Sequence, residues 1–173
     1  MRWVRTALLL VKAWEEEGGC RRADVLGDWL ETHLAEPANQ VLVFVQDAEA
    51  ADDLANRLEE RLGRSAVARF HCGIDEGALA ETAFRFQHDQ RCRVLVSDEL
   101  GGEGRNFQNA SAVVHFDLPA SCGRLEQRIG RLDRVGRRND KPVLSVVLEP
   151  STQSASALLE MQRDVFQVFT RTY

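Results

Sequence analysis

Residues 41–45 read Val-Leu-Val-Phe-Val, a run that is apolar at every position and mostly β-branched. Half-buried strands of antiparallel sheets alternate between apolar and polar residues, whereas strands of parallel sheets are apolar throughout because helices cover both faces. The run therefore predicts a strand in the middle of a parallel sheet, with helices on either side of it.

The residues after this strand predict a helix. Asp47 can accept hydrogen bonds from the free N–H groups of a first helical turn, and Gly63 is typical of the position just beyond a helix end. Between them, apolar residues recur at the spacing of a helix that packs one face on a sheet. These residues are Ala51, Leu54, Ala55, Leu58 and Leu62.

The alternation of strand and helix continues along the chain. Further strands are predicted at 67–70, 94–96, 112–116 and 143–148, and further helices at 24–34, 77–86 and 125–134. Such an order is typical of an α/β fold. We expect three layers, in which a mostly parallel central sheet lies between two layers of helices.

The two ends of the chain are expected to lie outside this main domain. We expect a lead-in helix over residues 1–23, the main domain over 24–150, and an amphipathic helix over 151–173 that packs on the domain or extends it. The apolar positions of the last helix are Leu158, Met161, Val165 and Val168.

Composition excludes several classes of protein. A net charge of −5 over 173 residues argues against a protein that coats nucleic acid through a general excess of positive charge. The apolar run 7–11 is too short to span a membrane, and Lys12 and residues 15–17 interrupt any signal-peptide core. The 4 cysteines are far apart and form no CxxC pair, which predicts neither a metal site nor a disulfide. We expect a cytoplasmic protein with no membrane partner, and a core role for His115.

The segment 127–134, Gln-Arg-Ile-Gly-Arg-Leu-Asp-Arg, is the most unusual part of the sequence. On a helix, its arginines at 128, 131 and 134 lie opposite Leu125, Ile129 and Leu132. Stacked like charges destabilise a helix by a few tenths of a kcal/mol per pair, and Gly130 costs about 1 kcal/mol relative to alanine. Both costs favour a role for the guanidinium groups in binding an anion. The alternative is a solvated basic face.

A glycine-rich segment lies before it, at 97–106, where glycines at 101, 102 and 104 would let the backbone approach a ligand closely. The apolar strand followed by Asp98 and Glu99 resembles the acidic pair of a magnesium-dependent ATPase. That chemistry needs a GxxxxGK[ST] phosphate loop, and neither Lys12 nor Lys141 lies in one. We therefore expect Asp98 and Glu99 to orient the loop or to contact a neighbouring domain. Asp117, after the next strand, is expected to accept hydrogen bonds from loop amides or from an arginine.

Taken together, these segments resemble superfamily-two helicases. Residues 127–134 resemble the last motif of that superfamily, 97–106 resemble the motif before it, and 41–44 resemble the opening strand of the second RecA-like domain. The pieces Gly-Gly-Glu-Gly-Arg-Asn-Phe-Gln (101–108), Phe-Asp-Leu-Pro (116–119) and 125–134 are most like the bacterial RNA-polymerase-associated members of the switch/sucrose-nonfermenting group. The resemblance covers about residues 24–150. It implies a RecA-like three-layer sandwich.

The resemblance implies a role for several residues in ATP hydrolysis. Arg131 and Arg134 match the arginines that reach the γ-phosphate of ATP. The positions that match nucleotide-contacting residues are Gly102, Gly104, Asn106 and Gln127. The phosphate loop is absent because it would belong to a first RecA-like domain, which would also hold most of the ATP and its Mg²⁺.

Other matching positions imply contact with nucleic acid. Ser97 matches a residue that usually meets a phosphate of the backbone, and the turn around His71 and Gly73 matches another backbone-binding segment. The implied function is the second motor domain of an ATP-dependent translocase on double-stranded DNA, with RNA polymerase as a possible partner. The alternatives are an ATPase-inactive module that binds nucleic acid or RNA polymerase, and a nucleotide-sugar enzyme of similar build. The isolated chain is expected to be inactive.

Overall fold

The computed structural model describes residues 7–11, 21–99, 107–132, 143–148 and 153–165. Within these ranges one parallel sheet has the strand order β1-β6-β5-β2-β4-β3. The strands are β1 (Ala7–Val11), β2 (Val41–Phe44), β3 (Val67–Phe70), β4 (Val94–Ser97), β5 (Ala112–His115) and β6 (Leu144–Leu148). The helices are α1 (Arg21–His33), α2 (Ala48–Leu62), α3 (Glu76–His88), α4 (Cys122–Gly130) and α5 (Gln153–Glu160), and α5 continues into a π-helical turn at Met161–Val165.

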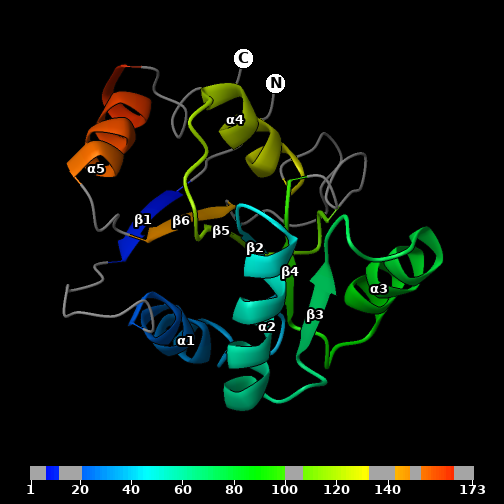
Figure 1. The fold of residues 1–173 in the computed structure, drawn as a ribbon. Coiled ribbons are helices and arrows are strands. Elements are labelled where there is room, and N and C mark those ends of the chain that lie inside the picture. Colours follow the sequence, from blue (N-terminus) through cyan, green and yellow to red (C-terminus); the bar gives the residue numbers. More distant parts are fainter. Residues whose placement is uncertain (1–6, 12–20, 100–106, 133–142, 149–152, 166–173) are drawn as a thin grey trace, which may run out of the picture.

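Helices cover both faces of this sheet, with α1 and α2 on one side and α3, α4 and α5 on the other (Figure 1). The central strand β2 shows why its sequence is apolar throughout. Leu42 and Phe44 pack toward α3 and α4, whereas Val41, Val43 and Val45 pack toward α1 and α2. The expected α/β fold with three layers is confirmed.

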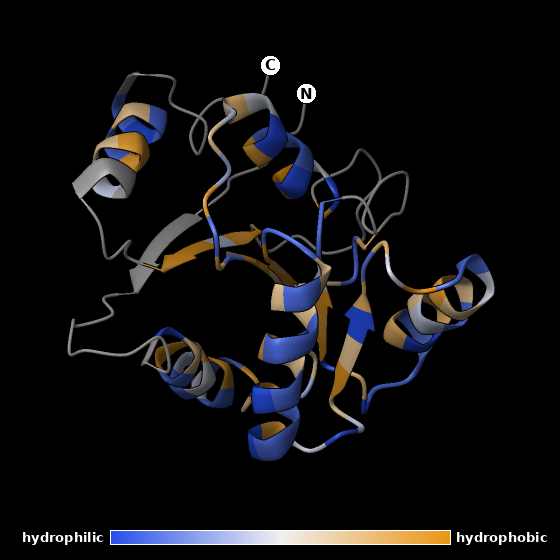
Figure 2. Ribbon diagram, in the orientation of Figure 1, coloured by the Kyte–Doolittle hydropathy of each residue, from blue (hydrophilic) through white to orange (hydrophobic). Residues whose placement is uncertain are grey.

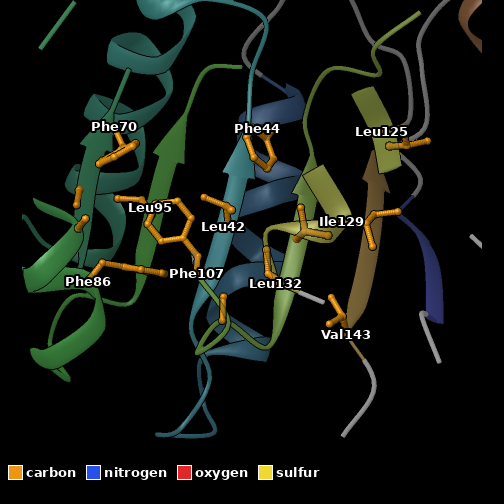
Figure 3. Packing of buried hydrophobic residues seen from close by; sticks show 14 of the residues in the cluster. Leu42, Phe44, Phe70, Phe86, Leu95, Phe107, Leu125, Ile129, Leu132 and Val143 are labelled. Carbon is orange, nitrogen blue, oxygen red and sulfur yellow. The ribbon is translucent and has the colours of Figure 1, made fainter. Parts of the chain in front are cut away.

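The core on the α3 and α4 side is built around aromatic rings. Phe107 lies edge-on to Phe70 and Phe86, with ring centroids 5.5 and 5.9 Å apart. Figure 3 shows the same cluster continuing across the sheet to the predicted apolar side of the arginine segment, Leu125, Ile129 and Leu132.

The helix predicted after β2 is confirmed in detail. Asp47 is its N-cap and accepts a hydrogen bond from the N–H of Ala50 at 2.9 Å. Gly63 ends it with φ 90°, and its N–H donates to the carbonyl of Glu59. The inward face of α2 is apolar and its outward face is largely hydrophilic (Figure 2).

The lead-in helix expected at the start of the chain is wrong over residues 7–11. They form β1, which pairs in parallel with β6 from Ala7 opposite Leu144 to Val11 opposite Leu148. A short apolar run fits a buried strand as well as a helix, and the free edge of β6 decides between them. α1 begins at Arg21, ahead of the expected residue 24.

At the other end, the amphipathic helix is present as α5, but its inward face differs from the prediction. Leu159 is buried in the core, whereas Met161 is 40% exposed. From Met161 to Val165 the helix continues as a π-helical turn, so the α-helical spacing on which the prediction relied does not hold there. Positions 166–173 lie outside the described residues. Among the described helices, none is both long and apolar enough to cross a membrane.

Gly63 generates a prediction about stability. Its φ of 90° is a conformation that residues with a Cβ rarely adopt. We expect Gly63→Ala to lower the free energy of unfolding by about 1–3 kcal/mol, measured by urea denaturation.

The matched control is Gly123→Ala, in the first turn of α4, where an added Cβ would lie at an ordinary 3.7 Å from Ser121. That variant should be neutral, or more stable by up to about 1 kcal/mol, because alanine favours helix. Equal losses in both variants would contradict the argument from φ.

Candidate functional site

The parallel register brings four loops together at one edge of the sheet. Phe44 pairs with Ser97 on one side and with His115 on the other, and Phe70 pairs with Ser97. β2, β3, β4 and β5 therefore end level with one another. In doubly wound sheets this carboxyl edge is where ligands bind.

Arg128 lies beneath this edge and is almost completely buried, at 2% exposure. Its Nε donates to Glu99 Oε1 at 2.7 Å, and its terminal nitrogens contact Glu99 Oε1 at 2.5 Å and the carbonyl of Asp117 at 2.6 Å. The guanidinium also lies over the ring of Phe44, 5.0 Å from its centroid. Burial lowers the pKa of Arg128, and the hydrogen bonds to Glu99 act in the opposite direction. The segment is therefore not simply a solvated basic face.

Residues on either side of positions 100–106 are bonded to this helix. Glu99 pairs with Arg128 of α4. Phe107 donates its N–H to the carbonyl of Arg131, the C-cap of α4, at 3.0 Å. Positions 100–106, which include the three glycines, lie outside the described residues.

Asp117 joins α1 to the turn before α2. Its carboxylate accepts a hydrogen bond from Arg22 of α1 at 3.2 Å and another from the backbone N–H of Gln46 at 3.2 Å. The expectation that it accepts from a loop amide or an arginine is confirmed for both. Arg22 also donates to the carbonyl of Phe116 and lies over its ring, 4.5 Å from the centroid. Arg22 was not predicted as a site residue, because no motif surrounds it in the sequence.

Asp98 holds the turn after β3, a contact that was not predicted. It is 3% exposed, and its Oδ2 accepts the N–H of Cys72 at 3.1 Å. A hydrogen bond between the Cys72 thiol and the Asp98 carboxylate raises the pKa of that thiol. In the same turn the N–H of Gly73 donates to His71 Nδ1 at 3.2 Å, while His71 Nε2 lies 3.3 Å from Asp52.

The structure places the predicted nucleic-acid residues in two environments. Ser97 is fully buried, and its hydroxyl donates to the carbonyl of Asp98 at 2.9 Å. His71 is 5% exposed, whereas Gly73 lies at the surface. A Cβ at Gly73 would lie 3.1 Å from the His71 ring, so glycine permits the close packing of this turn.

Of the residues predicted to contact nucleotide, only some are described. Gln127 is exposed on α4, and Arg131 is partly buried just after the helix. Arg134, Gly102, Gly104 and Asn106 lie outside the described residues. Among the residues that are described, no cluster of His, Cys, Asp or Glu could hold a metal ion.

His115 lies in the core beside this site, as expected. It is fully buried, and its Nε2 lies 2.9 Å from the hydroxyl of Ser145. Burial, and secondarily the charge of Arg128, hold the pKa of His115 well below its ordinary value. The imidazole is therefore neutral in the folded chain at neutral pH.

This lowered pKa predicts a loss of stability in acid. Below about pH 6.5 the unfolded chain takes up a proton at His115 that the folded chain does not. The free energy of unfolding should fall by up to about 1.4 kcal/mol per pH unit from this residue until the folded pKa is reached. Above about pH 6.5, where His115 is neutral in both states, its contribution to stability is complete.

The measurement is urea denaturation between pH 7.5 and about 5. His115→Gln, which can still bond Ser145, should have a shallower pH slope than the parent. Identical slopes for the parent and His115→Gln would contradict the assignment.

Comparison with known proteins places this geometry in a family. The sequence profile of the helicase conserved C-terminal domain matches residues 22–136. The RNA polymerase-associated protein RapA of Vibrio vulnificus is 38% identical over 144 residues, covering 82% of this chain and 15% of that protein. RapA of Cronobacter sakazakii is 43% identical over 129 residues, covering 73% of this chain and 13% of that protein. The chain thus spans only about 15% of the first of these relatives.

Solved structures agree on the fold. The C-terminal part of the Fun30 ATPase domain matches with a TM-score of 0.64 at 18% identity. The matched region covers 88% of this chain and 46% of the Fun30 chain. Saccharomyces cerevisiae Dbp5 bound to RNA and ADP BeF3 has a TM-score of 0.72 at 19% identity, and the match covers 95% of this chain and 39% of the Dbp5 chain. These neighbours have the RecA-like fold implied by the motifs. The chain belongs to the family of helicase conserved C-terminal domains.

Proposed function

We propose that this chain is the second motor domain of an ATP-dependent, helicase-like translocase on double-stranded DNA. ATP and Mg²⁺ would lie between it and a first RecA-like domain that carries the phosphate loop. The family match supports the motor role, and the sequence itself offers no GxxxxGK[ST] segment with which to bind ATP alone.

The observation that carries the proposal is the pair of contacts between α4 and residues 99 and 107, which flank the glycines in the sequence. Glu99 pairs with Arg128, and the N–H of Phe107 donates to the carbonyl of Arg131. The helix that carries the arginines is therefore held at the carboxyl edge of the sheet. Backbone N–H groups of a glycine-rich loop and guanidinium groups together suit a polyphosphate better than a general basic surface would.

Arg131 and Arg134 take the role of arginine fingers in this proposal. Phosphoryl transfer depends on positioning and on stabilising charge at the γ-phosphate, and an arginine finger contributes roughly 10³- to 10⁵-fold. The planar guanidinium can donate two parallel hydrogen bonds, which a lysine cannot. Gln127, Gly102, Gly104 and Asn106 would contact the nucleotide from the same side.

Nucleic acid would lie along the turns at the carboxyl edge. The exposed Gly73 would allow a backbone phosphate to approach closely. His71 and Ser97, being buried, would hold these turns in place from beneath. Domain closure around ATP and reopening after hydrolysis would then move the protein along the duplex.

The finger assignment predicts the behaviour of one variant. In the two-domain protein, Arg134→Ala should lower ATP turnover by roughly 10³-fold or more, because the charge at the γ-phosphate loses its partner. ATP binding should largely persist, since the phosphate loop lies in the other domain. Steady-state ATPase kinetics and nucleotide titration measure the two effects.

The control is Arg124→Ala, which removes an exposed arginine from the first turn of the same helix. It should leave turnover close to that of the parent. If Arg134→Ala also hydrolysed ATP at the parent rate, the finger assignment would be wrong.

A second candidate function is binding to RNA polymerase without ATP chemistry, favoured by the RNA polymerase-associated proteins that share 38–43% identity with this chain. The isolated chain separates the two. As one half of a motor it should show no ATP turnover and only weak DNA binding in gel-shift titrations at two salt concentrations, given its net charge of −5.

Firm binding of the isolated chain to purified core RNA polymerase, together with an inactive two-domain protein, would favour the binding module instead. Turnover of ATP by the isolated chain would contradict the proposal of a missing first domain.

A further inference from the structure

The ion pair between Glu99 and Arg128 lies at the centre of the site, yet neither residue is one of the proposed nucleotide contacts. We propose that this pair is a positioning device, which sets Arg131 relative to the ends of β4 and β5 so that its guanidinium meets the phosphates of the nucleotide. The proposal rests on the motor function proposed above. It concerns residues that act through others, because Arg128 is too deeply buried to reach a ligand itself.

The geometry explains how the pair would act. Arg128 and Arg131 are three residues apart, and therefore one turn apart, at the end of α4. With Arg128 bonded to Glu99, to the carbonyl of Asp117 and against Phe44, α4 cannot rotate or slide without breaking those contacts. The position of Arg131 is thus fixed from one turn upstream.

A second bond holds Arg131 from its own backbone. The N–H of Phe107 donates to the carbonyl of Arg131 at 3.0 Å. This backbone bond would remain in side-chain variants, so loss of the ion pair should loosen the position of Arg131 without releasing it.

A role in stability alone makes a different prediction. Arg128 is almost completely buried and the side chain of its partner Glu99 is 24% exposed. Replacing a buried ion pair by apolar residues of similar size is often neutral or stabilising. The double variant Glu99→Leu/Arg128→Met can therefore remain folded while it loses the directional bonds. This difference separates positioning from packing.

The test is carried out in the two-domain protein, with turnover and the KM for ATP measured for each variant and unfolding followed in urea. For Glu99→Leu/Arg128→Met we expect kcat to fall about 10- to 100-fold, the effect of a small misplacement of a reacting group. KM for ATP should stay within about twofold of the parent, and the urea midpoint should stay close to the parent value.

Glu99→Gln is the second variant, since it keeps the size of the side chain and an acceptor oxygen but removes the charge. It should show a smaller fall in kcat, again at nearly constant KM. Arg91→Gln is the control, because it breaks a surface ion pair with Asp89 in which the Arg91 side chain is 78% exposed. It should change neither parameter.

The outcomes separate this inference from the proposed function. If Arg134→Ala abolishes turnover while folded Glu99 and Arg128 variants keep the parent kcat, the positioning role is wrong and the motor role stands. A fall in kcat that only accompanies a lowered urea midpoint would likewise overturn positioning in favour of packing. If Arg134→Ala itself retains turnover, the motor role fails first.

Discussion

A positive charge inside an apolar core imposes the arrangement of this molecule's functional edge. The guanidinium of Arg128 has left water almost entirely, so its N–H groups must find acceptors within the protein. They find them at the ends of two strands, in Glu99 after β4 and in the carbonyl of Asp117 after β5, and Phe44 of β2 supplies an aromatic face. One side chain thereby ties the ends of three neighbouring strands to α4.

The rest of the edge extends outward from this centre. Asp117 is hydrogen-bonded to Arg22 of α1 and to the N–H of Gln46 before α2. Asp98 accepts a hydrogen bond from the N–H of Cys72 in the turn after β3. A buried ion pair adds little net stability, because desolvation offsets most of the attraction between its charges. Its value here lies in geometry, since an arrangement with several fixed donors and acceptors tolerates few alternative positions for α4.

Much of this fold could be predicted because it follows from local patterns. The apolar run 41–45, the cap at Asp47 and the end signal at Gly63 each act within a few residues, and the structure confirms them. The partnership of Arg128 with Glu99 could not be predicted, because it joins residues 29 positions apart and depends on the lateral order of the strands. The short apolar run 7–11 was read as helix for a related reason: only the open edge of β6, far along the chain, makes it a strand.

Among the strands that the structure describes, the two outermost, β1 and β3, differ in sequence. β3 carries Arg69 within it, and Arg85 of α3 donates to the carbonyl of Val67, so charge covers that margin. β1 reads Ala-Leu-Leu-Leu-Val, without a charged residue or a proline to interrupt it. Uninterrupted apolar outer strands are templates for pairing between molecules. Of the two outermost strands among the described residues, β1 is therefore better suited than β3 to pair with another molecule.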